Sequence, residues 1–114
     1  MNDDGVLSDR VADALTARGV DFEMKRMFGG TCFMVHDKMC VGVTKSRLMV
    51  RLDPEVEEEA LSRPGCEPMA FTGRRMKGFV FVHAEGTSED DLLASWLDLA
   101  LDFNPRARIS KKRR

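Results

Sequence analysis

The chain has 114 residues, 43% of them hydrophobic, and a formal net charge of −1 at pH 7, as is typical of one globular domain. No apolar run approaches the roughly 18 residues of a membrane helix, and the first residues lack the basic and apolar regions of a signal peptide. Because three cysteines are too few for a disulfide scaffold, we expect a cytoplasmic protein with free thiols and no membrane contact.

The first half of the chain predicts one helix and four strands. Apolar residues recur at helical spacing over residues 7–18, and Gly19 stands where a glycine commonly ends a helix. The period then changes to two, since Val20, Phe22 and Met24 alternate with charged residues as in a half-buried strand. The next three predicted strands are connected by short polar turns, which indicates an antiparallel meander; they span residues 31–35, 39–43 and 48–52.

The second half predicts a short helix, two strands and a longer helix. Asp53-Pro54 is a strong helix start, with a cluster of glutamates in the first turns, and Pro64-Gly65 ends that helix. Ser88 is predicted to cap the last helix, and Asn104-Pro105 to stop it. Between the helices we expect an edge strand at 69–71 after Pro68, a basic loop at 72–78 and a strand at 79–82.

The order of elements is therefore α-β-β-β-β-α-β-β-α, which predicts a two-layer α+β fold with an antiparallel sheet of about six strands and three helices. Residues 1–104 form the single domain and carry a charge of −7. Residues 105–114 hold six Lys and Arg and no acid, so we expect a basic, disordered tail that can touch polyanions.

Apolar residues on both faces of the predicted sheet point to a partner. Several strand positions that should be polar on a solvated face are apolar, namely Phe33, Val35, Cys40, Val80 and Val82. Either the helices are split across both faces, as in a two-sided core, or a second subunit packs there. We favour a homodimer, because three helices are few for two faces and a large bare apolar patch is unusual in a monomer.

Two glycine-bounded basic segments are the candidate binding residues. Arg26 precedes Gly29-Gly30, a pair that could form an anion-binding nest or simply bend a strand. Arg74, Arg75 and Lys77 could hold a phosphate or carboxylate, bind nucleic acid, or only neutralise nearby acids. The tail adds further cations that could contact DNA: Arg106, Arg108, Lys111, Lys112, Arg113 and Arg114.

No catalytic, metal or cofactor motif stands out. His36 and His83 have no neighbours at metal-ligand spacing, no Cys-x-x-Cys is present, and neither Gly29-Gly30 nor another segment matches a nucleotide-binding loop. No serine or cysteine can be grouped with a base. We therefore expect no metal and no cofactor, and we favour a protein without enzymatic activity over an enzyme.

Four segments together resemble the N-terminal domain of the TfoX/Sxy competence-regulator family. The similarity covers about residues 8–104, and its most specific part is the Met-Phe-Gly-Gly stretch before a short hairpin. The segments are residues 26–30, 37–39, 48–53 and 75–79. The resemblance implies a small α+β domain with an antiparallel sheet. It also implies a link to natural transformation and to promoters, with a cyclic-AMP receptor protein as partner, in regulators that carry a second, helical domain, which we expect this stand-alone chain to lack.

Two functions follow as hypotheses. The first is a non-enzymatic regulatory or adaptor domain that binds a protein partner in transcription, and DNA through Arg74, Arg75, Lys77 and the tail. The second is a small anionic-ligand-binding domain or an enzyme, in which Gly29-Gly30 and residues 74–77 meet to form an anion pocket. The two differ in whether those segments converge in space.

Overall fold

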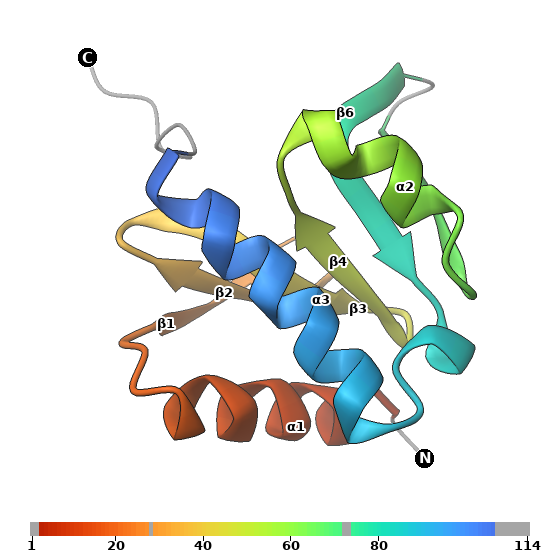
Figure 1. The fold of residues 1–114 in the computed structure, drawn as a ribbon. Coiled ribbons are helices and arrows are strands. Elements are labelled where there is room, and N and C mark those ends of the chain that lie inside the picture. The colour runs from red at the N-terminus through yellow and green to blue at the C-terminus, as the bar shows by residue number, and fades with distance from the viewer. Residues whose placement is uncertain (1–2, 28, 72–73, 107–114) are drawn as a thin grey trace.

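The computed structural model describes residues 3–27, 29–71 and 74–106, without the side chains of residues 3–4, 27, 70–71 and 74–76. Three α-helices lie over a six-stranded antiparallel sheet, so the fold is the expected two-layer α+β arrangement (Figure 1). The helices are α1 (Asp3–Ala17), α2 (Glu57–Leu61) and α3 (Asp90–Phe103). Among the described residues, no helix combines the length and apolar character needed to cross a membrane.

The strands follow one another along the sheet except for one exchange near the end, giving the order β1-β2-β3-β4-β6-β5. The strands are β1 (Glu23–Met27), β2 (Gly30–Val35), β3 (Lys38–Thr44), β4 (Arg47–Arg51), β5 (Cys66–Phe71) and β6 (Arg74–Val82). Short 3-10 helices are η1 (Pro54–Val56), η2 (Ala84–Gly86) and η3 (Asn104–Arg106). The predicted edge position of the strand after the short helix is confirmed, since β5 pairs with β6 alone among the described strands.

Two tight turns build the central meander. His36 and Asp37 both have positive φ, of 55° and 64°, and Lys45 and Ser46 repeat the pattern with 51° and 63°. Two successive residues of positive φ match the right-handed twist of the strands they join. The short polar segments after residues 35 and 44 therefore reverse the chain as predicted.

The face of the sheet toward the viewer in Figure 1 holds the main core, under all three α-helices. The residues paired across the sheet at its centre are aliphatic or aromatic, and those on β2, β3, β4 and β6 have no exposed surface. We call this line of partners the helix-facing row: Met24, Phe33, Val41, Val50, Val80 and Pro68. Burial of this row against Trp96, Leu97 and the other apolar helix positions is the main stabilising term.

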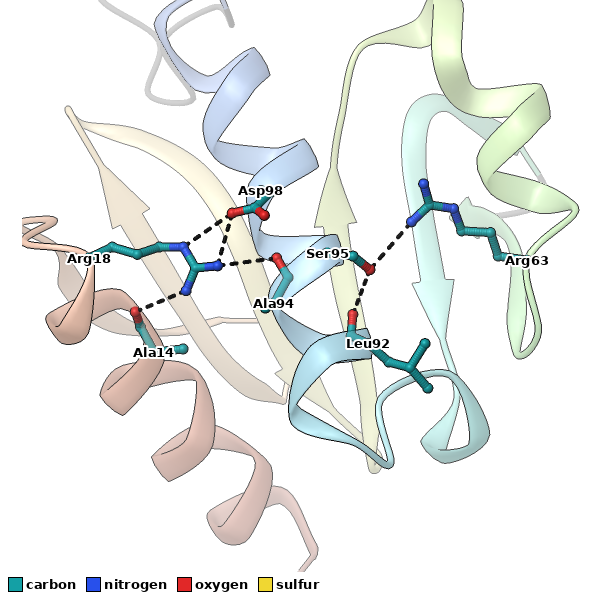
Figure 2. Close-up of polar contacts among 7 residues, drawn as sticks. All are labelled: Ala14, Arg18, Arg63, Leu92, Ala94, Ser95 and Asp98. Atoms are coloured by element: carbon teal, nitrogen blue, oxygen red, sulfur yellow. Dashed lines mark hydrogen bonds and ion pairs between the residues drawn. The ribbon is translucent and has the colours of Figure 1, made fainter.

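Arginines from both sides tie α3 to the rest of the helical layer (Figure 2). Arg18, just after α1, donates to the Asp98 carboxylate at 2.9 Å and to the carbonyl of Ala94. Arg63, just after α2, donates to the Ser95 hydroxyl, which in turn donates to a carbonyl one turn earlier. These exposed contacts orient the helices more than they stabilise them, because surface ion pairs contribute little.

The opposite face, which we call the far face, is closed by the sheet's own side chains, since none of the described α-helices packs on it. The residues paired across this face form a second row, and the middle of that row is buried. Gly42 leaves room for the Met49 side chain to lie across it, since a Cβ at Gly42 would be 3.2 Å from Met49 Cε. Charged residues stand at both ends of the row. Its partners are Lys25, Cys32, Gly42, Met49, Phe81 and Glu67.

The assignment of sheet faces from sequence is therefore wrong in detail. All five residues that we placed on the second face belong to the helix-covered core instead, namely Phe33, Val35, Cys40, Val80 and Val82. The helices are not split across both faces either. Alternation along a strand separates two sets of residues, but where both sets are apolar it does not say which set meets the helices.

Several predicted boundaries also change. Residues 74–78 are not a basic loop but the first part of β6, and β5 begins at Cys66, so the two strands form a longer hairpin. Ser88 does not cap α3, because η2 displaces its start and Glu89 takes the N-cap position without a side-chain cap bond. The predicted first helix begins earlier, at Asp3.

The strand predicted around Val20, Phe22 and Met24 begins later than expected, at Glu23. Val20 and Phe22 pack against the core as predicted, but Met24 is 52% exposed. Met24 lies on the outermost strand, at the margin of the helical layer, and so the same alternation no longer buries it.

Candidate functional site

The described residues form a hollow of about 350 Å³ where β4 ends, β6 bends and α3 terminates. Three cations border it, namely Arg51 of β4, Lys77 of β6 and Arg106 of η3, which follows α3. Its remaining walls are mostly apolar: Leu52, Pro54, Gly78, Phe79 and Phe103. Figure 1 shows in its upper part the end of α3 and β6, two of the elements that border the hollow.

The turn after β4 forms the floor of the hollow. Asp53 caps η1 as predicted, its carboxylate accepting a hydrogen bond from the Glu55 backbone N–H at 3.0 Å. The same carboxylate accepts from Arg106 at 2.8 Å, which holds η3 against the turn. The Glu55 N–H and then Arg106 lower the pKa of the Asp53 carboxyl, so this pair stays charged at neutral pH.

Gly78 places Lys77 at the rim. Its φ of 87° bends β6, its carbonyl accepts from the Leu52 N–H at 2.8 Å, and its N–H donates to the buried Glu57 carboxylate at 2.8 Å. A Cβ at this position would lie 3.2 Å from the Leu52 carbonyl oxygen. Only glycine adopts this conformation without strain, so the Lys77-Gly78 sequence is a structural device as well as a source of charge.

Each arginine of the hollow lies near an aromatic wall. The Arg51 guanidinium is 5.4 Å from the Phe79 ring centre, and the Arg106 guanidinium is 5.4 Å from the Phe103 ring centre. Burial lowers the pKa of Arg51, although this side chain remains a cation at any physiological pH. A partly desolvated guanidinium between flat apolar walls suits a phosphate or carboxylate group.

The two candidate segments from the sequence do not meet. Lys77 lies beside the end of β4, whereas Gly30 packs against Val43 and Thr44, next to the turn that starts β4. The anion pocket predicted from Gly29-Gly30 together with residues 74–77 is therefore not formed. Of the predicted residues whose side chains the structure describes, Lys77 and Arg106 come together at the hollow.

Gly29-Gly30 has a structural explanation of its own. Gly29 adopts a φ of 76°, and a Cβ on Gly30 would lie 2.1 Å from the Val43 carbonyl oxygen. The pair thus closes the β1–β2 turn where another strand passes closely. Arg26 is exposed on β1, away from the hollow.

The remaining predicted cations can be placed only in part. Arg74 and Arg75 lie in β6 by their backbone, and their side chains are outside the described set. Arg108, Lys111, Lys112, Arg113 and Arg114 lie outside the described residues, and so does the expected disorder beyond residue 106. The first two residues of the predicted tail, 105 and 106, belong to η3 instead.

Arg51 and Phe103 were missed by sequence reasoning. Arg51 stands in an apolar strand segment, and Phe103 in an apolar helix face, so neither differs from a structural residue by pattern. The only available signal was that Arg51 belongs to one of the segments carrying the family resemblance.

The histidines and cysteines form no reactive group within the described part of the chain. His83 Nε2 lies 2.9 Å from the Glu67 carboxylate, and His36 Nδ1 lies 2.9 Å from the Asn104 side chain. Burial raises the pKa of Cys32 to about 11 and of Cys40 to about 12, so neither thiol is activated. No cluster of three His, Cys, Asp or Glu among the described residues has the arrangement of a metal site.

Comparison with known proteins gives the family. The sequence model of the TfoX N-terminal domain matches residues 14–104, which run from the last turn of α1 through β1 to the end of α3. The chain belongs to the TfoX N-terminal domain family. No curated protein matches it significantly.

A solved structure supports the fold of this family member. The crystal structure of a protein from Pseudomonas syringae superimposes with a TM-score of 0.60, at 10% sequence identity, over 85% of this chain and 97% of that one. At this identity the likeness extends to the arrangement of helices and strands and carries no functional residue across.

Proposed function

We propose that this TfoX N-terminal domain is a non-enzymatic regulatory or adaptor domain that contacts nucleic-acid phosphates through the end of the molecule containing the hollow. The convergence of Arg51, Lys77 and Arg106 supports this proposal, because they come from three separate elements. The chain continues from Arg106 into five more cations: Arg108, Lys111, Lys112, Arg113 and Arg114. Family membership favours a role in transcriptional regulation, together with a protein partner.

The distribution of charge sets the direction of such a contact. Residues 1–104 carry −7 and residues 105–114 carry +6, so a polyanion is repelled by most of the surface and attracted to one end. Lys77 also borders a second hollow with Glu55 and Glu58. These acids disfavour phosphate contact on that side of Lys77, so the contact is proposed on the Arg51 and Arg106 side, where Arg106 also pairs with Asp53 and Asp102.

Binding of a fluorescently labelled duplex, followed by anisotropy over a series of salt concentrations, tests the proposal. We expect affinity to fall steeply with salt, and Lys77→Gln to weaken binding and reduce the slope of the log–log plot by about one phosphate contact. Replacing the five cations after Arg106 by glutamine should remove most of the affinity.

Arg10→Gln is the matched control, because it removes one partly exposed cation from α1, outside the hollow. It should leave DNA binding nearly unchanged. Absence of salt-sensitive binding at low ionic strength, or equal loss with Arg10→Gln and Lys77→Gln, would contradict the nucleic-acid contact.

Phe79 and Phe103 favour a second candidate, a small anion with a flat apolar body. Two aromatic walls beside two guanidinium groups can hold a ring and its carboxylate together, which a phosphate backbone does not require. Benzoate should then raise the melting temperature more than acetate at equal concentration and ionic strength, and Lys77→Gln should reduce the difference. Equal shifts with the two carboxylates would count against this candidate.

A further inference from the structure

The two edges of the sheet differ in whether they can accept another strand. β5 contains Pro68 and an irregularity between Pro68 and Ala70, features that block regular pairing at an edge. β1 has neither, and within the described residues it pairs only with β2. Its residues 23–26 are all exposed. The outward N–H and C=O groups of β1 can therefore pair with a further strand.

We propose that β1 pairs antiparallel with β1 of a second copy of this chain, around a two-fold axis at Met24. A two-fold axis perpendicular to a sheet keeps each side chain on its own face, so only residues of the same face can stand opposite each other. The possible registers are thus few, and the charges on β1 distinguish among them.

With Met24 opposite its own copy, Glu23 of each chain stands opposite Lys25 of the other. Both residues belong to the far face, since Glu23 pairs with Met34 and Lys25 with Cys32 within one chain. Two opposite-charge pairs then form across the axis. Moving the register by one allowed step in either direction brings Glu23 against Glu23 or Lys25 against Lys25, and cross-strand like charges destabilise a sheet.

The same register accounts for the exposed side chain at the end of the helix-facing row. Met24 is 52% exposed, one of the few large hydrophobic residues with that degree of exposure among those described. Opposite its copy, it would continue the row formed by Phe33, Val41, Val50 and Val80 into the second chain. Apolar contact and charge pairing thus favour one alignment, which gives a continuous sheet of both copies.

The contact is short, and so we expect a weak dimer whose population depends on concentration. Sedimentation equilibrium of the full chain over a wide concentration range should show a monomer–dimer equilibrium. Glu23→Lys alone and Lys25→Glu alone each create two like-charge pairs, and each should weaken self-association by about tenfold or more.

A mixture of those two variants gives the decisive test of the register. Glu23→Lys supplies lysines at both positions and Lys25→Glu supplies glutamates at both, so the mixture should form a heterodimer although each protein alone is monomeric. The double variant E23K/K25E should recover self-association. Glu58→Lys, an exposed charge reversal on α2, is the matched control and should leave the equilibrium unchanged.

Thermal unfolding of each variant verifies that the fold is retained, because all these positions are exposed. A wild-type chain that stays monomeric at the highest concentration would overturn the proposal. Self-association that persists in Glu23→Lys, or that is not recovered in the mixture, would overturn it as well by placing the contact on another surface. The outcome is independent of the nucleic-acid contact, because the hollow lies at β4 and β6 and not at β1.

Discussion

The side chains on the two faces of the sheet are buried in two different ways. The helix-facing row is aliphatic and buried beneath Trp96 and Leu97 of α3. The far face is buried at its centre by Met49 lying across Gly42, and at its margin by Arg47 stacked 3.7 Å above the centre of the Phe81 ring. A residue can thus be buried on either face, but only on the first do its neighbours belong to a second layer of structure.

The largest expected effect comes from opening a cavity on the helix-facing side. Leu48 has no exposed surface and lies between β3 and β6 beneath the helices. Leu48→Ala should lower the free energy of unfolding by about 3 kcal/mol, because α3 and the sheet cannot close the space left behind. Urea unfolding measures this loss. A loss below about 1 kcal/mol would mean that the helical layer readjusts freely.

Met49→Ala, one residue along the same strand, makes the matched change on the far face. Met49 is nearly as buried as Leu48. Its side chain packs against Gly42 and not against a helix, so water can enter the space it leaves. We expect a loss of about 1–2 kcal/mol, smaller than that of Leu48→Ala. Equal losses in parallel urea titrations would show that the two faces are packed alike.

The buried thiols make stability depend on pH in the alkaline range. Burial raises the pKa of Cys32 to about 11 and of Cys40 to about 12, against 9.0 for an unburied thiol. The unfolded chain therefore releases these protons first, and stability declines as pH rises above 9 until the folded pKa values are reached. The loss is on the order of 1 kcal/mol per thiol by pH 10.

Cys40→Ala should reduce the alkaline decline, even though it lowers stability at neutral pH by removing a buried side chain. Urea midpoints at pH 8, 9 and 10 separate the two effects, with cysteine kept reduced throughout. An unchanged slope in Cys40→Ala would show that other groups cause the decline.

The smallest effect concerns the margin of the far face. Arg47 stacks on Phe81 and lies 3.7 Å from the Glu67 carboxylate. Arg47→Ala should cost about 0.5–1 kcal/mol, since the ion pair with Glu67 is partly exposed to water and the stacking contact is modest. Arg10→Ala, which loses only an exposed ion pair with Asp90, should cost less and serves as control. If the Arg47→Ala variant has the same urea midpoint as the wild type, the stacked guanidinium does not stabilise the far face.

Local chemistry made most of the fold predictable. Gly19, with a φ of 72° after α1, and Asp53, which caps η1, act within a few residues of where they stand. Short polar turns bring neighbouring strands together without help from distant residues. The order of elements and the edge position of β5 could therefore be inferred from the chain alone.

The candidate site was predictable only in part, because it depends on contacts between distant segments. Lys77 and Arg106 attracted attention as charges, yet their proximity follows from the hydrogen bond that Arg106 donates to Asp53 and from the bend at Gly78. Apart from its place in a segment that carries the family resemblance, nothing in the sequence marked Arg51, since an arginine in an apolar strand has no local signature of binding. The expected union of Gly29-Gly30 with residues 74–77 failed because β4 separates them by its full length.

The sequence by itself determined which segments become helices and strands and how consecutive strands turn, since those outcomes follow from nearby side chains and backbone preferences. Only the tertiary structure decided which side of the sheet the helices cover, which cations share the hollow, and which edge remains open at β1. The reason is that both faces of the central strands are apolar, and the choice between them depends on how distant helices pack.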